Sequence, residues 1–249
     1  MIEALTSCVA VIGACAILVI LIDGCVSDAR WFMIAEFKVE CYRPVLFPVT
    51  YNPYMIDERF KELYGSRDDT HELLSLQSYW YLYVSVKRCL KVAGEFWECG
   101  VYRGGSAQFI REAAPGKVLR LFDTFCGMPQ CDPERDPVHA KGDFDDTSLE
   151  RVKTRVGVFA VDYHKGDIPA TFEGLEDKKI AFAHVDVDIY KSVKDCCEFI
   201  WPRLEQGGMI LFDDYGHPTC PGARLAVDEY FDGVTVPVNL YTGQAMVFK

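Results

Sequence analysis

The chain has 249 residues, of which 50% are hydrophobic and 25% are charged, so it can build one large domain with a substantial core, and general disorder is excluded. Its formal net charge of −11 offers no cationic face to a phosphate backbone, which argues against a nucleic-acid partner. The 11 cysteines include no Cys-x-x-Cys pair and make an odd total, so we expect buried free thiols in a reducing compartment rather than a disulfide framework.

Residues 5–22, near the N-terminus, carry no charged side chain and are mostly aliphatic. Their length is at the lower limit for a membrane-spanning helix. A secretory signal would begin with basic residues, whereas Glu3 is the only charge before this segment. The pattern favours a membrane anchor over residues 1–26 that carries a cytoplasmic catalytic domain. The alternative is an apolar segment in a homo-oligomer interface, and the flanking charges are too few to predict an orientation.

A linker and a helical cap are expected over residues 27–93. Residues 27–55 mix aromatic side chains with several prolines, which is typical of a linker or lid. Residues 56–64 and 71–91 carry apolar side chains at helical spacing, so we expect two helices there. These helices would form an N-terminal helical extension of the domain that follows.

From Gly94 onward, strand patterns alternate with helical patterns. Regular alternation of this kind predicts an α/β domain over residues 94–249, with a mainly parallel sheet and helices on both faces. The strand patterns lie at 95–99, 118–122, 156–161, 180–185, 208–212 and 244–248, and the helical patterns at 106–114, 147–155, 191–204 and 222–231.

A glycine-rich loop follows the first predicted strand of this domain. Gly100 permits a tight turn and a close approach of the backbone to a ligand, and Ser106 is the expected N-cap of the next helix. Asp123 ends the second strand, where the ribose hydroxyls of a nucleoside would be held, although it also fits a simple turn or cap. The spacing departs from Gly-x-Gly-x-x-Gly, so S-adenosylmethionine is favoured over a nicotinamide cofactor.

Two later strands each end in a pair of carboxylates, Asp186 with Asp188 and Asp213 with Asp214. A single helix is expected between them, so the strands should be parallel and adjacent, with their carboxyl ends at one edge of the sheet. Four carboxylates in one place repel each other unless a cation or a proton intervenes. Oxygen ligands suit magnesium, calcium or manganese, and one carboxylate would be left over as a base. Each pair alone also fits an ordinary cap or turn.

These motifs together resemble the macrocin O-methyltransferase family, whose members act on sugars of antibiotics. The resemblance implies a Rossmann-like, seven-stranded class I methyltransferase that uses S-adenosylmethionine and magnesium. Two departures are Cys126, where the family has an acidic residue, and the apolar N-terminus. The matching stretches occur in family order and are residues 97–106, 122–129, 184–190, 212–216 and 221–229.

The resemblance also assigns roles to individual residues. Asp186, Asp213 and Asp214 would ligate the metal, and Asp188 would be the general base. His217 is a competing base, while His184 is interpreted as a core residue. The acidic run 143–146 would line the substrate side or form a solvated loop. The implied cofactor-binding residues are Glu98, Cys99, Gly100, Val101, Tyr102, Gly104, Ser106, Asp123 and Thr124.

The expected function is therefore methyl transfer from S-adenosylmethionine to a hydroxyl of a magnesium-chelated sugar or other vicinal diol. The partner would be a small molecule or a glycan, and the sequence does not identify it. One rival is a membrane-anchored glycosyltransferase in which Asp186-Val187-Asp188 is the Asp-x-Asp element that holds a metal. Another is a non-catalytic nucleoside-binding scaffold, which would need no spare aspartate.

Overall fold

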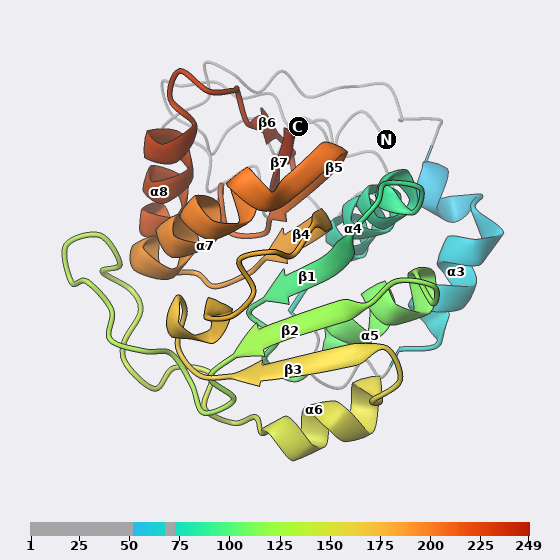
Figure 1. Ribbon diagram of the computed structural model, residues 1–249, viewed down its shortest axis with the longest axis horizontal. Coiled ribbons are helices and arrows are strands. Elements are labelled where there is room, and N and C mark those ends of the chain that lie inside the picture. The colour runs from blue at the N-terminus through green and yellow to red at the C-terminus, as the bar shows by residue number, and fades with distance from the viewer. Residues whose placement is uncertain (1–51, 68–72) are drawn as a thin grey trace, which may run out of the picture. The chain divides into compact units, whose positions relative to one another are not determined.

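A seven-stranded sheet forms the centre of the part of the chain that the computed structural model describes, residues 52–67 and 73–249 (Figure 1). The strand order is β3-β2-β1-β4-β5-β7-β6. Strands β1 to β5 are parallel, and β7 runs antiparallel between β5 and β6. The strands are β1 (Glu95–Cys99), β2 (Leu119–Asp123), β3 (Val161–Lys165), β4 (Ile180–Val185), β5 (Leu204–Phe212), β6 (Val238–Asn239) and β7 (Ala245–Phe248).

The central strands are buried on both sides because helices cover both faces of the sheet. Every residue of β4 is buried, and so is every residue of β1 after Glu95. Parallel strands covered on both faces need mostly apolar side chains, and Glu98 in β1 and His184 in β4 are the buried exceptions. The chain first builds β1, β2 and β3 outward in one direction and then returns to add β4 beside β1. This reversal creates a crevice at the carboxyl ends of β1 and β4, which is where ligands bind in open α/β sheets.

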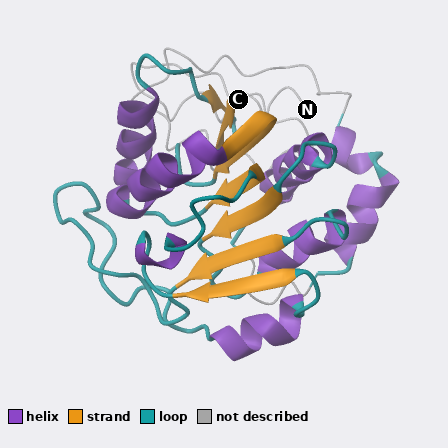
Figure 2. Cartoon of the chain, in the orientation of Figure 1, coloured by secondary structure: helices purple, strands orange, loops and turns teal. Residues whose placement is uncertain are grey.

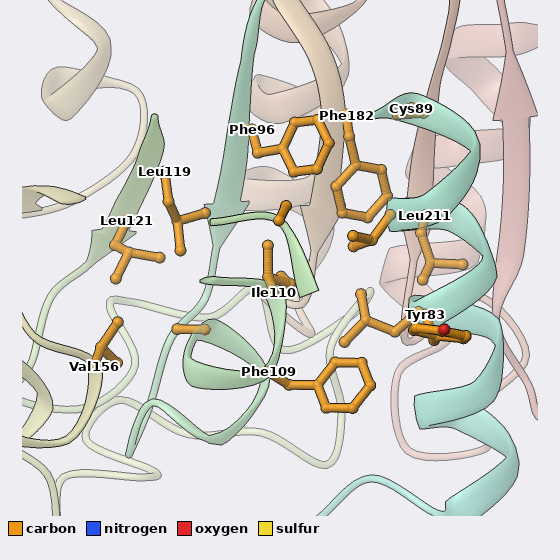
Figure 3. Close-up of a cluster of buried hydrophobic side chains, with 14 of the residues drawn as sticks. Tyr83, Cys89, Phe96, Phe109, Ile110, Leu119, Leu121, Val156, Phe182 and Leu211 are labelled. Carbon is orange, nitrogen blue, oxygen red and sulfur yellow. The ribbon is translucent and has the colours of Figure 1, made fainter. Parts of the chain in front are cut away.

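Among the described residues, four helices and the one-turn η1 (Pro53–Met55) lie on one side of the sheet. Asp57 caps the first of these helices by accepting a hydrogen bond of 2.9 Å from Phe60 N, and Ser75 caps the second in the same way. In Figure 3, strand residues such as Phe96, Phe182 and Leu211 meet side chains of these helices in one buried layer. The helices are α3 (Glu58–Gly65), α4 (Leu76–Cys89), α5 (Gly105–Ala113) and α6 (Leu149–Val156).

The opposite face of the sheet packs against α7 (Tyr190–Arg203), α8 (Pro221–Phe231) and the short η3 (Ala170–Phe172). Trp97 and Phe122 point to this face, one residue away in sequence from side chains that point to the other face. The arrowheads of β1, β2 and β3 lie at one edge of the sheet, where long loops gather (Figure 2). The two helical layers therefore leave this edge available for a ligand site.

Most of the predicted elements are confirmed, and the differences have local causes. The third strand occupies residues 161–165 instead of 156–161, because α6 continues to Val156 and Gly157, with φ +88°, ends it. Ser106 is not the N-cap of α5, since Gly104 takes that position with φ +82°. Strand β6 was not predicted from the sequence, and its two residues are both exposed.

The expected anchor, residues 1–26, lies outside the described residues, as does the part of the predicted linker up to residue 51. Within the described ranges, no helix combines the length and the apolar character that a membrane span requires. The helices predicted over 56–64 and 71–91 correspond to α3 and α4, and α4 packs directly on the sheet. The cysteines of the described part are free, and all except Cys126 are buried.

Candidate functional site

A pocket of about 380 Å³ lies at the carboxyl ends of the parallel strands, and this volume is typical of small-molecule sites. Its wall contains residues from the glycine loop after β1 and from the loops after β2, β3, β4 and β5. The sequence-predicted residues that line it are Gly100, Val101, Tyr102, Ser106, Asp123, Thr124, Asp186, Asp188, Asp213, Asp214 and His217.

Gly100 is the point at which the glycine loop meets the end of β4. Its φ is +85°, and a Cβ built there would lie 1.6 Å from the carbonyl oxygen of Asp186. Only glycine fits a backbone contact this close. Gly104 is the N-cap of α5, where the chain changes direction, and it is not part of the pocket wall. The glycine loop is therefore shaped by two glycines with different tasks, of which only Gly100 faces the pocket.

Asp123 holds the glycine loop in place. Its Oδ2 accepts hydrogen bonds from the backbone amides of Val101 (2.7 Å) and Tyr102 (2.9 Å), and its Oδ1 accepts one from Phe125 N (2.5 Å). A carboxylate has about four lone-pair directions, so most of its capacity is used within the protein. Asp123 already organises the pocket wall through these hydrogen bonds. The predicted contact with a ribose would use the lone-pair directions of its carboxylate that remain free.

The acidic loop between β2 and α6 is fastened to the glycine loop. Asp146 accepts a hydrogen bond of 2.7 Å from the hydroxyl of Tyr102 and forms an ion pair with Arg103. Met128 N donates to the carbonyl oxygen of Asp143 at 2.7 Å, which closes the loop on itself. The acidic run is thus tied to the pocket wall instead of being only solvated.

The three predicted metal ligands come together. Asp186, Asp213 and Asp214 each place a carboxylate oxygen within 4.8 Å of the others. The sheet ladder positions two of them, because Asp186 N donates to Cys99 O at 2.8 Å and Asp213 N donates to Val185 O at 2.9 Å. Gln244 on the neighbouring loop donates to Asp213 Oδ1 at 2.7 Å and fixes its orientation.

The electrostatics of this cluster suit a divalent cation. Burial, and then repulsion by Asp213, raise the pKa of Asp186 well above its ordinary value. Burial, and then the charges of Asp188 and Asp186, do the same to the pKa of Asp214. Carboxylates crowded in this way must bind protons or a cation, and three oxygen donors are what a hard ion such as Mg²⁺ prefers. The residues present therefore fit a magnesium ion.

Beneath the acidic cluster lies a buried chain of polar side chains. Glu98 Oε1 is 2.9 Å from Nδ1 of His184, whose Nε2 lies 3.5 Å from Asp213 Oδ1. Both Glu98 and His184 are fully buried. Burial alone would lower the pKa of His184, but its contacts with Asp213 and Glu98 outweigh this and raise the pKa well above its ordinary value. A protonated His184 would support the charge and the orientation of Asp213.

Three of the predicted cofactor contacts, Gly104, Glu98 and Cys99, are not in the pocket wall. Glu98 faces His184, and Cys99 is fully buried in the layer beneath α7. The interpretation of His184 as a core residue is confirmed by its burial. His217 lines the pocket and is exposed, with its Nδ1 2.7 Å from the hydroxyl oxygen of Thr219.

Asp188, the predicted base, groups with His139 and Cys220 and not with the three predicted metal ligands. Its φ of +57° is uncommon for a residue with a side chain, although aspartate tolerates it better than most. Its Oδ1 lies 3.5 Å from Cys220 Sγ and 3.9 Å from His139 Nε2. Burial raises the pKa of Asp188, and the nearby His139 partly opposes this effect. Neither His139 nor Cys220 was predicted as a site residue, since each lies in a separate loop outside any recognisable motif.

The end of β3 contributes a second set of pocket residues that the sequence analysis missed. Gly166, Asp167 and Ile168 line the pocket directly after this strand. Residues at the carboxyl end of a parallel strand are the ones expected to face a ligand. Because the third strand was predicted at 156–161 instead of 161–165, these three residues were not recognised as such.

Residues 84–248 match the family model described as Macrocin-O-methyltransferase (TylF). The chain is 30% identical over 176 residues to the 8-demethyl-8-(2,3-dimethoxy-alpha-L-rhamnosyl)-tetracenomycin-C 4'-O-methyltransferase of Streptomyces olivaceus, covering 64% of this chain and 66% of that protein. It is 30% identical over 159 residues to the mycinamicin III 3''-O-methyltransferase of Micromonospora griseorubida, covering 57% of this chain and 61% of that protein. The matches thus span less than two thirds of the length of these curated relatives.

Solved structures of methyltransferases have a similar fold. The O-methyltransferase NovP is similar with a TM-score of 0.62 at 23% identity, over 71% of this chain and 81% of that chain. CalS11, a calicheamicin methyltransferase, is similar with a TM-score of 0.57 at 23% identity, over 70% of this chain and 80% of that chain. The predicted fold, a Rossmann-like class I methyltransferase, is confirmed.

Proposed function

This chain belongs to the macrocin-O-methyltransferase (TylF) family, and we propose that it transfers a methyl group from S-adenosylmethionine to a sugar hydroxyl. The observation that carries the proposal is that one pocket contains both the glycine loop and the acidic cluster. A methyl donor and a metal-bound acceptor would then lie side by side. The names of the relatives support a sugar acceptor, and one of them specifies a rhamnosyl-bearing tetracenomycin.

The donor would bind along the part of the pocket formed by the loops after β1, β2 and β3. The proposed contacts are the pocket-lining residues Gly100, Val101, Tyr102, Ser106, Asp123 and Thr124. Asp167 and Ile168 add a carboxylate and an apolar side chain, which suit the amino group and the ring face of an adenine. Gly104, Glu98 and Cys99 would support this region from behind the wall.

The acceptor would bind at the acidic cluster. Asp186, Asp213 and Asp214 would hold Mg²⁺, which supplies Lewis-acid polarisation of an oxygen bound to it. Asp188 is the proposed base: its carboxylate takes the proton of the reacting hydroxyl while the hydroxyl oxygen bonds to the methyl carbon. S-adenosylmethionine would supply the methyl group, and cleavage of its carbon–sulfur bond would leave the neutral thioether S-adenosylhomocysteine.

The protein's own contribution is proton removal and orientation. A raised pKa makes Asp188 a stronger base than an exposed aspartate, provided that it is ionised at the working pH. Fixing donor and acceptor in one pocket supplies the alignment that methyl transfer requires. His217, which is exposed and bonded to Thr219, would contact the acceptor and is the competing candidate for the base.

Calorimetry with the full chain tests the donor half of this proposal. We expect S-adenosylhomocysteine to bind with one-to-one stoichiometry and a uridine or thymidine diphosphosugar not to compete with it. Binding of the nucleotide sugar alone would instead favour the glycosyltransferase that the Asp-x-Asp motif had suggested. Donor binding without methyl transfer to any polyol would favour a non-catalytic scaffold.

A further inference from the structure

A second group of metal-binding side chains lies beside the acidic cluster and differs from it in chemistry. It consists of His139 from the loop after β2, Asp188 from the end of β4 and Cys220 from the turn before α8. His139 Nε2 is 3.4 Å from Cys220 Sγ, and Cys220 Sγ is 3.5 Å from Asp188 Oδ1. The third separation, from His139 Nε2 to Asp188 Oδ1, is 3.9 Å.

These separations are close to the edges of a tetrahedral zinc site. Zinc binds sulfur at about 2.3 Å and nitrogen or oxygen at about 2.0–2.2 Å, so tetrahedral ligands lie roughly 3.4–3.6 Å apart. Two of the three observed separations fall in this range, and the third needs a contraction of a few tenths of an ångström. One nitrogen, one sulfur and one oxygen donor suit zinc and not magnesium, which prefers oxygen ligands alone.

The surroundings of the three side chains support the same conclusion. The other ring nitrogen of His139 lies 3.7 Å from Asp143 Oδ2, beyond hydrogen-bond distance, so a shift of about half an ångström would let this carboxylate orient a zinc-bound histidine. The hydroxyl of Thr219 lies 3.4 Å from Cys220 Sγ and can donate to a thiolate. His139 and Asp188 line the pocket, so a metal can enter there and keep its fourth position open to water.

The group is also held firmly from behind. Asp136, in the same loop as His139, accepts a hydrogen bond of 2.9 Å from Tyr190 N at the start of α7. Gly222 lets α8 pack against it, because a Cβ at that position would lie 2.0 Å from Asp136 Oδ1. The loop that carries His139 is thereby fixed against the two helices next to Asp188 and Cys220.

We propose that His139, Asp188 and Cys220 form a zinc-binding site. Bound zinc would inhibit methyl transfer because it occupies the carboxylate of Asp188, which then cannot accept the proton of the acceptor hydroxyl. The thiol of Cys220 loses its proton to solvent when the metal–sulfur bond forms. The binding site stands on the geometry alone, whereas the inhibition rests on the proposed function of Asp188 as the base.

Cobalt substitution tests the site without any assay of activity. The reduced full-length chain, freed of metal, is titrated with Co²⁺, whose bond to a thiolate gives a charge-transfer band in the near ultraviolet. We expect one equivalent of this band in the wild type and in the matched control Cys126→Ser, which alters an exposed loop cysteine. The band should be lost in Cys220→Ser and should disappear from the wild type when Zn²⁺ is added.

A competition titration with a chromophoric chelator measures the zinc affinity directly. We expect His139→Gln to lower the affinity about tenfold or more, the least that loss of a metal contact costs. Circular dichroism confirms that each variant is folded. The site is overturned if folded wild type gives no thiolate band, or if the band and the affinity survive in both Cys220→Ser and His139→Gln.

The same samples separate this inference from the proposed function. A thiolate band without methyl transfer to any acceptor would leave the zinc site in place and remove the proposed activity. Methyl transfer that micromolar Zn²⁺ does not inhibit, in a protein that shows the band, would refute the inhibitory role of the site.

Discussion

The backbone N–H of Asp188 donates a hydrogen bond of 3.0 Å to Oδ2 of Asp214. This contact ties the loop after β4 to the residues after β5 and accompanies the left-handed backbone of Asp188. As a result, Asp214 faces Asp186 and Asp213, while the side chain of Asp188 faces His139 and Cys220. The proposed base is held beside the proposed metal ligands without being one of them.

Replacing the proposed base should lower turnover by orders of magnitude and spare donor binding. Asp188→Asn keeps the shape of the side chain and tolerates the left-handed backbone, but it cannot accept the proton. We expect kcat to fall by about 10²–10⁴-fold, with unchanged affinity for S-adenosylhomocysteine in calorimetry. Asp232→Asn, at the exposed end of α8, is the matched control and should retain full activity. If Asp188→Asn turned over as fast as the wild type, Asp188 would not be the base, and His217 would be the next candidate to test.

Gly100→Ala should disrupt the junction of the glycine loop with β4. The new Cβ would overlap the carbonyl oxygen of Asp186, so the backbone must move in addition to adopting an unfavourable left-handed conformation. Gly174→Ala is the matched control, because its φ of +81° is similar and a Cβ there meets nothing within 4 Å. We expect the control to lose about 1–2 kcal/mol of unfolding free energy, the cost of the conformation alone, and Gly100→Ala to lose clearly more. Equal losses in urea denaturation would contradict the close contact.

The acidic cluster should bind a divalent cation independently of catalysis. If Mg²⁺ binds the folded chain only, saturation at about 100 times its dissociation constant stabilises the protein by about 2.7 kcal/mol. We therefore expect Mg²⁺ to raise the melting temperature of the wild type and to leave that of Asp214→Asn unchanged. Asp132→Asn, which removes a carboxylate outside the pocket wall, should respond to Mg²⁺ as the wild type does. A similar response in Asp214→Asn would exclude this carboxylate as a ligand.

The ion pair between Glu95 and Arg120 should make a pH-dependent contribution to stability. Glu95 Oε2 lies 2.5 Å from Arg120 Nε and Oε1 lies 3.1 Å from Nη2, which joins β1 to β2. Burial alone would raise the pKa of Glu95, but the hydrogen bonds and the charge of Arg120 lower it below its ordinary value of about 4.5. The stabilisation is therefore fully present above pH 4.5 and is lost as the pH falls through the lowered pKa of the folded state.

Comparing the unfolding free energies of wild type and Glu95→Gln across this range measures the effect. We expect a difference of about 1.5–3 kcal/mol at pH 7, which shrinks below pH 4.5. Glu150→Gln removes an exposed ion pair with Lys153 at 3.7 Å and should cost at most about 1 kcal/mol. A difference for Glu95→Gln that is constant with pH would mean that the pair does not lower the pKa of Glu95.

The sequence was most informative where a motif coincides with the end of a strand. The convergence of Asp186, Asp213 and Asp214 could be predicted because adjacent parallel strands share an edge, and the structure brings these side chains together. Glu98 was expected to contact a cofactor because the family resemblance places a cofactor-binding residue at this position. Its actual partner depends on the register that pairs Glu98 with His184 across β1 and β4, and a single sequence does not contain this register.

Contacts between loops that are distant in sequence could not be predicted either. His139 and Cys220 are 81 positions apart and meet only because the loop after β2 folds across the start of α8. The preference for Ser106 as a helix cap was sound for an average helix, but Gly104, two residues earlier, takes the N-cap position in a left-handed conformation. Local propensity therefore predicted the elements, while the tertiary arrangement decided which polar groups reach the pocket.

The most direct test of the proposed function is transfer of a labelled methyl group from S-adenosylmethionine to a set of glycosides with free vicinal hydroxyls. The purified chain is incubated with each glycoside in the presence of Mg²⁺ or of EDTA, and the product is analysed for the position of the label. We expect label on a sugar oxygen only when Mg²⁺ is present, and none with Asp188→Asn. Transfer that proceeds equally in EDTA, or label found on nitrogen or carbon, would contradict an acceptor held by the carboxylates of Asp186, Asp213 and Asp214.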